Sequence, residues 1–177
     1  MTEANNPFTN ELQQKLRAFS GELNLCFNEI KVLGQSMVHT SYINDHPTQS
    51  VESNERLEFL GDAVLDYVVA KYLYSSFSEM SEGNLTVARV ALVREETLAR
   101  IARELSLGEL LFLGQGEESS GGRDRDSNLA GALEALIGAI SLDIGVGSAE
   151  SFILNILDND IKAISIKRTE IPVDSRN

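Results

Sequence analysis

The sequence predicts an all-α domain, and three observations carry that prediction. Apolar residues recur at helical spacing along most of the chain, no segment alternates apolar and polar residues with the period of a strand, and the 177 residues include only 3 prolines. A chain of this length corresponds to about one domain of ~150 residues. We therefore expect one helical domain over residues 10–165, followed by a linker or tail over residues 166–177.

The expected helices follow one another with short polar connections. The first opens at Thr9, and the longest has Ser53 as its N-cap. Residues 114–126 are rich in Gly, Ser and charge and are expected to form a loop, whereas residues 128–142 are so apolar that their helix must be mostly buried. In chain order, the expected helices cover residues 9–19, 28–43, 54–77, 81–93, 94–105 (continuing or restarting the one before), 128–142 and 148–164.

Composition excludes several classes of protein. One cysteine, Cys26, rules out a disulfide framework and a Cys-rich zinc site. We expect no signal peptide and no membrane span, and a reducing cytoplasm as the compartment. The glycines at 114–122 follow no strand and precede no Gly-Lys-Ser/Thr, so we expect no nucleotide cofactor.

The net charge of −12 argues by itself against a generic nucleic-acid binder, because Lys and Arg make the contacts to phosphate. Two interpretations of this acidity stay open. The negative charge is either concentrated where divalent cations bind or spread over a solvated acidic surface.

Three carboxylates share one face of the longest expected helix. Glu55, Glu58 and Asp62 stand at i, i+3 and i+7, within an arc of roughly 60°. Like charges at this spacing repel each other. A solvated acidic face is one explanation, and binding of a hard divalent cation, which would reverse the repulsion, is the other.

A fourth carboxylate lies in the most apolar helix. Glu134 is the only ionisable residue between Asp126 and Asp143. A buried carboxylate must be protonated, paired or bound to a metal, so its partner is either a structural group such as an arginine or a cation facing the first three acids. Four carboxylates without a His or Cys cluster suit Mg²⁺ or Mn²⁺ rather than zinc.

Residues 55–65, ERLEFLGDAVL, resemble the signature of the ribonuclease III endonuclease domain. The resemblance extends over about residues 10–165. It includes the His-containing segment at 37–42, the segment at 82–93 that begins EGNLT, the loop at 120–123 and the second acidic helix at 133–139.

The resemblance implies an all-helical, homodimeric endonuclease that cuts double-stranded RNA with Mg²⁺ as cofactor and Mn²⁺ as a substitute. Ribosomal and messenger RNA processing are the implied settings. By motif position, Glu58, Asp62 and Glu134 resemble metal ligands, with Asp62 and Glu134 as catalytic residues. The remaining matches are Glu55 and Glu82, which resemble acidic residues at the cleft edge, and Phe59, which resembles an aromatic inserted into the partner subunit, its alternative being ordinary core.

One position departs from the family pattern. Gly131 stands where the family has an aspartate, three residues before Glu134 and on the same helical face. Glycine removes a carboxylate and costs ~1 kcal/mol relative to alanine inside a helix. We expect weakened metal binding with slow or absent cleavage; alternatively, the chain is a catalytically deficient double-stranded-RNA-binding or ribosome-associated protein of the same fold.

Two further expectations concern class and chain length. A helical nucleotide hydrolase with a carboxylate metal site is a third class, but it would not explain the signature. Most members of the family append a basic double-stranded-RNA-binding domain after a linker, and residues 170–176 resemble the start of that linker. We expect a truncated or domain-only chain.

Overall fold

The structure is a computed structural model that describes residues 8–169, and it confirms the all-α prediction for them. The described residues form helices joined by turns and loops, apart from one isolated parallel bridge between Val38 and Phe112. The helices are α1 (Asn10–Glu22), α2 (Ile30–Ser36), α3 (Thr40–Asp45), α4 (Glu55–Ser76), α5 (Glu82–Val93), α6 (Glu95–Glu104), α7 (Gln115–Ser119), α8 (Asp126–Asp143), α9 (Val146–Ile156) and α10 (Asp158–Thr169), with 3-10 turns at Leu107–Leu110 and Gly122–Asp124.

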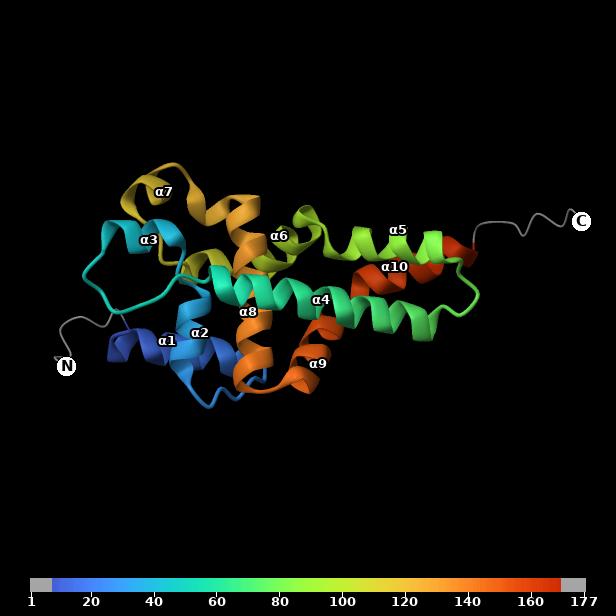
Figure 1. Cartoon of the computed structure of the whole chain (residues 1–177), viewed down its shortest axis with the longest axis horizontal. Helices are drawn as coiled ribbons and strands as arrows, with labels where there is room; N and C mark the ends of the chain where they lie inside the picture. Colours follow the sequence, from blue (N-terminus) through green and yellow to red (C-terminus); the bar gives the residue numbers. More distant parts are fainter. Residues whose placement is uncertain (1–7, 170–177) are drawn as a thin grey trace, which may run out of the picture.

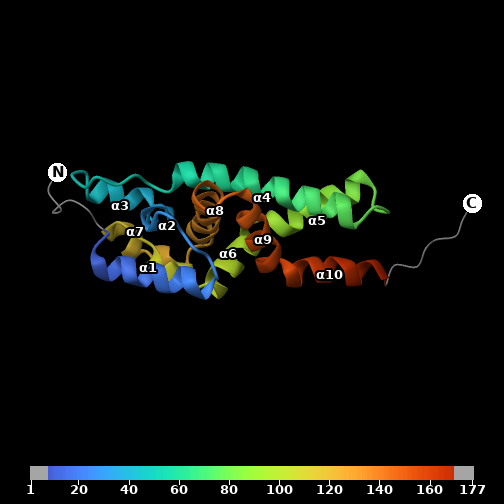
Figure 2. The same cartoon turned by 90° about the horizontal axis from the view of Figure 1, so that it is seen from below.

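Helix α8 lies at the centre of the fold, as its composition predicts. Nearly every residue from Leu129 to Ile140 is buried, because the helix is apolar on all sides and packs against α2, α4, α6 and α9. Helix α4 crosses α8 steeply on the face seen in Figure 1, and α1 and α6 lie on the opposite side of α8 in Figure 2. The one acid that α8 carries in this stretch, Glu134, is half-buried, unlike its apolar neighbours on the same helix.

Two glycines bring the backbones of α4 and α8 into contact. A Cβ atom on Gly61 of α4 would lie 1.7 Å from the carbonyl oxygen of Glu134, and one on Gly138 of α8 would lie 2.1 Å from the carbonyl oxygen of Leu57. Any larger residue at either position would push the helices apart. Because Glu58 and Asp62 flank Gly61 along α4, this crossing decides which α8 residues they meet.

The expected helix at 28–43 is wrong, because the chain leaves the helix between Met37 and His39. There the backbone pairs with Phe112: the Phe112 N–H donates to the Met37 carbonyl (2.8 Å), and the His39 N–H donates to the Phe112 carbonyl (3.1 Å). His39 then starts α3 as its N-cap, accepting from the Ser41 N–H. The N-cap expected for α4 is also wrong: Asn54 holds that position, while the Ser53 hydroxyl donates to Glu55 (2.8 Å).

The later segments differ in two places. The expected loop at 114–126 contains α7 and a 3-10 turn, and the expected helix at 148–164 is two helices that meet at Leu157. Helix α10 runs to Thr169, so the expected linker is helical at its start. Residues 170–177 of that linker lie outside the described residues. In the part of the chain that the structure describes, no helix has the length and apolar character needed to span a bilayer.

Candidate active site

The crossing of α4 over α8 brings Glu58 and Asp62 to Glu134. Burial, together with the nearby negative charges of Asp62 and Glu58, raises the pKa of Glu134 to about 7. Burial likewise raises the pKa of Glu58, with Glu55 and Asp62 adding to the effect. The acidic edge of α4 and the solitary acid of α8 therefore lie within electrostatic reach of one another.

These three carboxylates have no protein countercharge. Among the side chains that the structure describes, which are those of residues 8–164, the side chains of Glu58, Asp62 and Glu134 form no ion pair or hydrogen bond with another residue. The alternative of a structural arginine partner for Glu134 is thus not what the structure shows. Asp62 is exposed to water, whereas Glu58 and Glu134 are half-buried. A half-buried carboxylate without a countercharge either holds its proton, as the raised pKa of Glu134 indicates, or attracts a cation.

The donor set fits a hard divalent cation in its chemistry, since all three residues offer carboxylate oxygens. The described side chains do not form a closed cage: among residues 8–169, no three His, Cys, Asp or Glu side chains come close enough together to hold a metal ion. Binding would therefore require Glu58, Asp62 and Glu134 to turn toward a common point.

Gly131 lies directly opposite Glu58. A Cβ atom at this position would be 2.9 Å from the Glu58 Oε2 atom and 3.1 Å from its Cδ atom. The carboxylate of Glu58 thus lies against the α8 backbone, in space that a side chain at position 131 would occupy. Glycine allows this approach, and no fourth carboxylate comes from α8 at this point.

The two residues predicted for the cleft edge lie in different places. Glu55 is exposed at the start of α4, and hydrogen bonds from Ser53 and then Thr40 hold its pKa below the usual range. Glu82 begins α5, accepts a hydrogen bond from the Thr86 hydroxyl (3.0 Å) and lines a small groove with Tyr74. Within this chain, Glu55 joins the carboxylate region and Glu82 does not.

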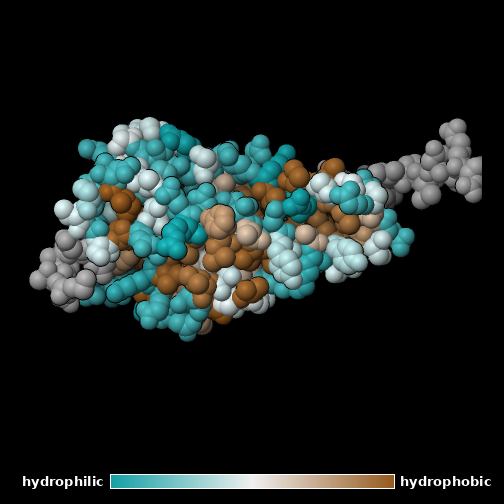
Figure 3. Space-filling model, in the orientation of Figure 1, coloured by the Kyte–Doolittle hydropathy of each residue, from teal (hydrophilic) through white to brown (hydrophobic). Residues whose placement is uncertain are grey.

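Phe59 is 80% exposed, so the alternative of an ordinary core residue is wrong. It begins a stripe of exposed large side chains that continues along α4 with Tyr67 and Tyr74 and is joined by Val87 and Val90 of α5. We call these five residues the α4–α5 face. Figure 3, drawn in the orientation of Figure 1, shows hydrophobic side chains gathered across the middle and right of the molecule.

Sequence reasoning missed two acids near Glu134. The charges of Asp66 and Glu95 also raise the pKa of Glu134. Asp66 accepts from Arg89 through Oδ2 (2.9 Å), and its buried Oδ1 has no partner within the described residues. Its position four residues after Asp62, on the same helix face, is a signal that the sequence did contain.

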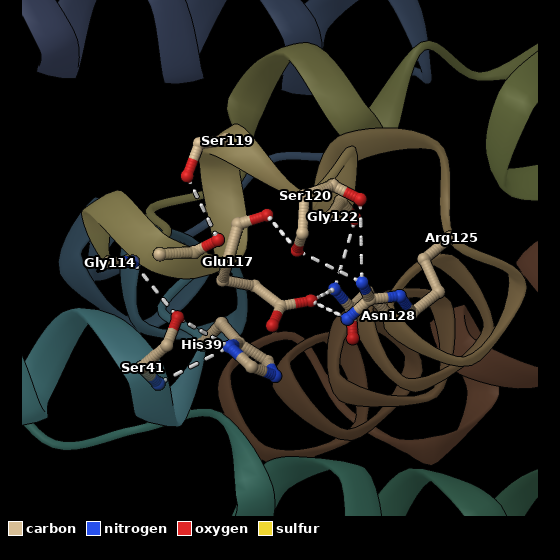
Figure 4. A network of polar contacts seen from close by, with 10 residues as sticks. His39, Ser41, Gly114, Glu117, Ser119, Ser120, Gly122, Arg125 and Asn128 are labelled. Atoms are coloured by element: carbon tan, nitrogen blue, oxygen red, sulfur yellow. Dashed lines mark hydrogen bonds and ion pairs between the residues drawn. The ribbon is translucent and has the colours of Figure 1, made fainter.

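A second missed feature is a polar network beside the carboxylates, shown in Figure 4. Glu117 of α7 accepts from the side-chain amide of Asn128 (2.7 Å) and pairs with Arg125, and His39 contacts the Ser41 hydroxyl (2.8 Å). The hydrogen bond from Asn128, aided by Arg125, holds the pKa of Glu117 below its usual range. The network joins α3, α7 and the start of α8. These segments are far apart in the sequence, so the spacing of residues within any one of them does not predict the contact.

Carboxylates that lie together without a countercharge, two of them half-buried, suit a hard divalent cation, and a cation held in this way can assist chemistry on phosphate groups. The sequence matches the Ribonuclease-III-like family over residues 29–161. The chain belongs to that family.

Individual relatives agree with this assignment. Ribonuclease 3 of Bacillus cytotoxicus is 47% identical over 145 residues, covering 82% of this chain and 59% of the relative, and Ribonuclease 3 of Enterococcus faecalis is 44% identical over 154 residues, covering 87% and 66%. The chain thus spans roughly 55–66% of the length of such curated relatives.

A solved structure of the nuclease domain of Ribonuclease III from Campylobacter jejuni, described for flexibility in a region involved in dimer formation, aligns with a TM-score of 0.76 at 37% identity. The alignment covers 83% of this chain and 99% of that one. Dicer from Pichia stipitis aligns with a TM-score of 0.59 at 27% identity, covering 78% and 59%.

Proposed function

We propose that this domain is a Mg²⁺-dependent endoribonuclease that hydrolyses phosphodiester bonds of double-stranded RNA, in the processing of ribosomal and messenger RNA. The observation that carries the proposal is the meeting of Glu58 and Asp62 with Glu134 at the α4–α8 crossing, without a protein countercharge, in a chain of this family. The cytoplasm remains the expected compartment, on the basis of a sequence with a single cysteine.

The roles follow from charge and position. Glu58, Asp62 and Glu134 would hold the cation, which when bound supplies positive charge against the negative charge that develops on the phosphate. Glu134 must release its proton first, because its pKa of about 7 leaves it partly protonated near neutral pH. Glu55 lies at the edge of the site with a lowered pKa, so its carboxylate is ionised and only accepts hydrogen bonds. It therefore favours hydrogen-bond donors of the RNA, such as hydroxyl groups, over a phosphate, which offers only acceptors.

The test is cleavage of a structured RNA duplex by the full chain, with Mg²⁺ or Mn²⁺ and with chelator. We expect short duplex products only with the cation, and a loss of at least about 100-fold in rate for Asp62→Asn and Glu134→Gln, because each removes a charge that the cation needs. Glu109→Gln, an exposed carboxylate away from the crossing, is the matched control and should cut at the wild-type rate. Equal rates for Glu134→Gln and wild type would contradict the proposal, and turnover of mononucleotides would favour a nucleotide hydrolase.

A second candidate is a catalytically deficient double-stranded-RNA-binding or ribosome-associated protein. Gly131 is the observation that favours it, because the α8 side of the site lacks the family's aspartate opposite Glu58. Duplex RNA that binds without yielding products under Mg²⁺ would support this candidate over the nuclease.

The proposed partner of the α4–α5 face is a second copy of this chain. Phe59 projects from a face that also carries a groove lined by Leu73, Tyr74 and Leu85, so two copies related by a twofold axis would offer each other an aromatic side chain and a recess. The choice of a second copy as the partner is supported by the similar nuclease domain from Campylobacter jejuni, which is described as having a region involved in dimer formation.

Phe59→Ala tests the dimer. Loss of a buried aromatic anchor should raise the dimer dissociation constant by about 30-fold, the equivalent of about 2 kcal/mol. Sedimentation equilibrium measures it. Leu142→Ala removes a side chain that is also exposed, at 65%, but lies at the end of α8, and it should leave the constant unchanged. A wild-type chain that is monomeric at micromolar concentration would contradict the proposal.

A further inference from the structure

A polar cavity of about 240 Å³ adjoins the carboxylates where α3, α4 and α8 begin. Its lining includes Glu58, which also faces Gly131, so its occupant would be next to the proposed cation site. Pockets for drug-sized ligands have about 300–1,000 Å³, so this cavity suits a single sugar or a smaller group. The lining residues are His39, Thr40, Asn54, Glu55, Glu58, Ser127 and Asn128.

His39 presents a fixed hydrogen-bond donor to this cavity. The Ser41 backbone N–H donates to Nδ1 (3.2 Å), so Nδ1 carries a lone pair and the proton of the neutral ring is on Nε2. The Ser41 hydroxyl accepts from the Gly114 N–H (2.9 Å) and donates to the same Nδ1 (2.8 Å), which agrees with that assignment. Nε2 lies on the side of the ring away from Ser41 (Figure 4) and makes no hydrogen bond to any side chain or backbone group of residues 8–164.

Asn128 presents a fixed acceptor. Its side-chain Nδ2 donates to Glu117 Oε1 (2.7 Å) and to the Gly122 carbonyl (2.9 Å), so both amide hydrogens are used and the orientation of the amide is determined. Arg125 pairs with Glu117 and holds that carboxylate in place (Figure 4). Oδ1 of Asn128 is left as an acceptor without a partner in the described part of the chain.

The polarity of the lining selects the chemistry of the occupant. A phosphate offers only acceptors, and the carboxylates of Glu55 and Glu58 would repel it. A hydroxyl group both accepts and donates, so it could accept from His39 Nε2 and donate to Asn128 Oδ1 or to Glu55. The 2′-hydroxyl is the group that RNA has and DNA lacks.

We propose that this cavity binds the ribose 2′-hydroxyl of a nucleotide beside the cleaved phosphate, with His39 and Asn128 as the residues that distinguish RNA from DNA. The inference rests on the proposed function, because it places duplex RNA at the carboxylate site. The observations behind it are two polar atoms of fixed orientation without a partner among the described residues: the donor Nε2 of His39 and the acceptor Oδ1 of Asn128.

The experiment measures binding rather than cleavage. Duplex RNA in which one ribose at a time is replaced by deoxyribose is titrated with the full chain in the presence of Ca²⁺, and anisotropy gives the dissociation constant at each position. Cleavage of the same duplexes with Mg²⁺ is measured separately. For wild type we expect one position near the cut where the deoxy substitution weakens binding by about 3- to 10-fold, the size of one hydrogen bond.

Two variants of His39 form a matched pair. In His39→Asn, an amide oxygen can replace Nδ1 as the cap of α3 but nothing replaces the Nε2 donor, so this variant should melt like wild type and show no penalty at that position. His39→Gln places an amide N–H near Nε2 and should keep the penalty while losing the cap. Retention of the full penalty by His39→Asn, or a wild type without a penalty at any position, would overturn the subsite.

The outcomes separate this inference from the proposed function. Duplex RNA that is cut without any position-specific penalty overturns only the subsite. Duplex RNA that binds with the penalty but is never cut supports the subsite and overturns the nuclease. A duplex that does not bind overturns both.

Discussion

Gly61 and Gly131 both face the opposite helix of the α4–α8 pair, but they meet different atoms there. A Cβ atom on Gly61 would lie 1.7 Å from a backbone carbonyl oxygen, which cannot move without moving α8. A Cβ atom on Gly131 would lie 2.9 Å from a carboxylate oxygen of Glu58, the far end of a flexible side chain. The same residue type therefore serves the fold at one position and changes the site at the other.

This difference shows why the two glycines have separate explanations. Gly61 lets two helix backbones touch, so its absent side chain is part of the packing. At position 131, a side chain would contact only the end of Glu58, and a change in the rotamer of Glu58 could relieve that contact. Its main consequence is the missing carboxylate.

The largest effect is expected for Gly61→Ala. The new methyl group would overlap the Glu134 carbonyl, so the helices must separate and the free energy of unfolding should fall by about 3 kcal/mol, despite the ~1 kcal/mol that alanine gains in helix propensity. Urea unfolding followed by circular dichroism measures it. Gly83→Ala, near the exposed start of α5 with open space around it, is the control. A loss below about 0.5 kcal/mol would mean that the crossing is looser than described.

Glu134 should make stability depend on pH in the metal-free protein. Its pKa is about 7 in the folded protein and near 4.5 in the unfolded chain, so its favourable contribution is complete below about pH 4.5 and is lost as pH rises through 7. Glu134→Gln removes this dependence.

The free energy of unfolding of Glu134→Gln, relative to wild type, should therefore rise by about 1–2 kcal/mol between pH 4 and pH 8. The full value of ~1.4 kcal/mol per pKa unit is reduced because the side chain is partly exposed to solvent. Urea unfolding in chelator at both pH values measures the difference. A difference that stays constant with pH would show that neither burial nor the charges of Asp62 and Glu58 raise the pKa of Glu134.

Gly131→Asp should tighten Mn²⁺ binding and speed duplex cleavage by about tenfold, because it adds a carboxylate beside Glu58. Calorimetry gives the affinity independently of cleavage. Gly131→Ala separates the carboxylate from its bulk: it displaces Glu58 in the same way but adds no ligand, so it should not tighten binding. Equal cleavage rates for wild type and Gly131→Asp at matched Mg²⁺ would end the idea of a weakened site.

The smallest effect is that of Gly131→Ala on stability. The end of Glu58 can turn away, and alanine favours the helix by ~1 kcal/mol, so the free energy of unfolding should change by less than about 0.5 kcal/mol. The contrast with Gly61→Ala, measured under the same conditions, is the direct test of the comparison between the two glycines.

Much of the fold followed from local patterns, and its errors have a common cause. The buried helix α8 and the long helix α4 were predicted from residues within each segment. The predicted helix at 28–43 failed because Phe112, far along the chain, pairs with the backbone on both sides of Val38. A pairing between distant residues leaves no trace in the spacing of apolar side chains.

The sequence by itself determined the helical class, the four carboxylates and the odd glycine at 131, because helix spacing and the apolar character of α8 are local properties. Only the tertiary structure decided that Gly61 packs against the backbone of Glu134, that Phe59 is exposed, and that the Ser41 hydroxyl meets Gly114, 73 residues away, so that the His39 ring is fixed. Such contacts depend on how whole helices cross and on which surfaces remain uncovered. That geometry is set by the sum of the packing and not by any one segment.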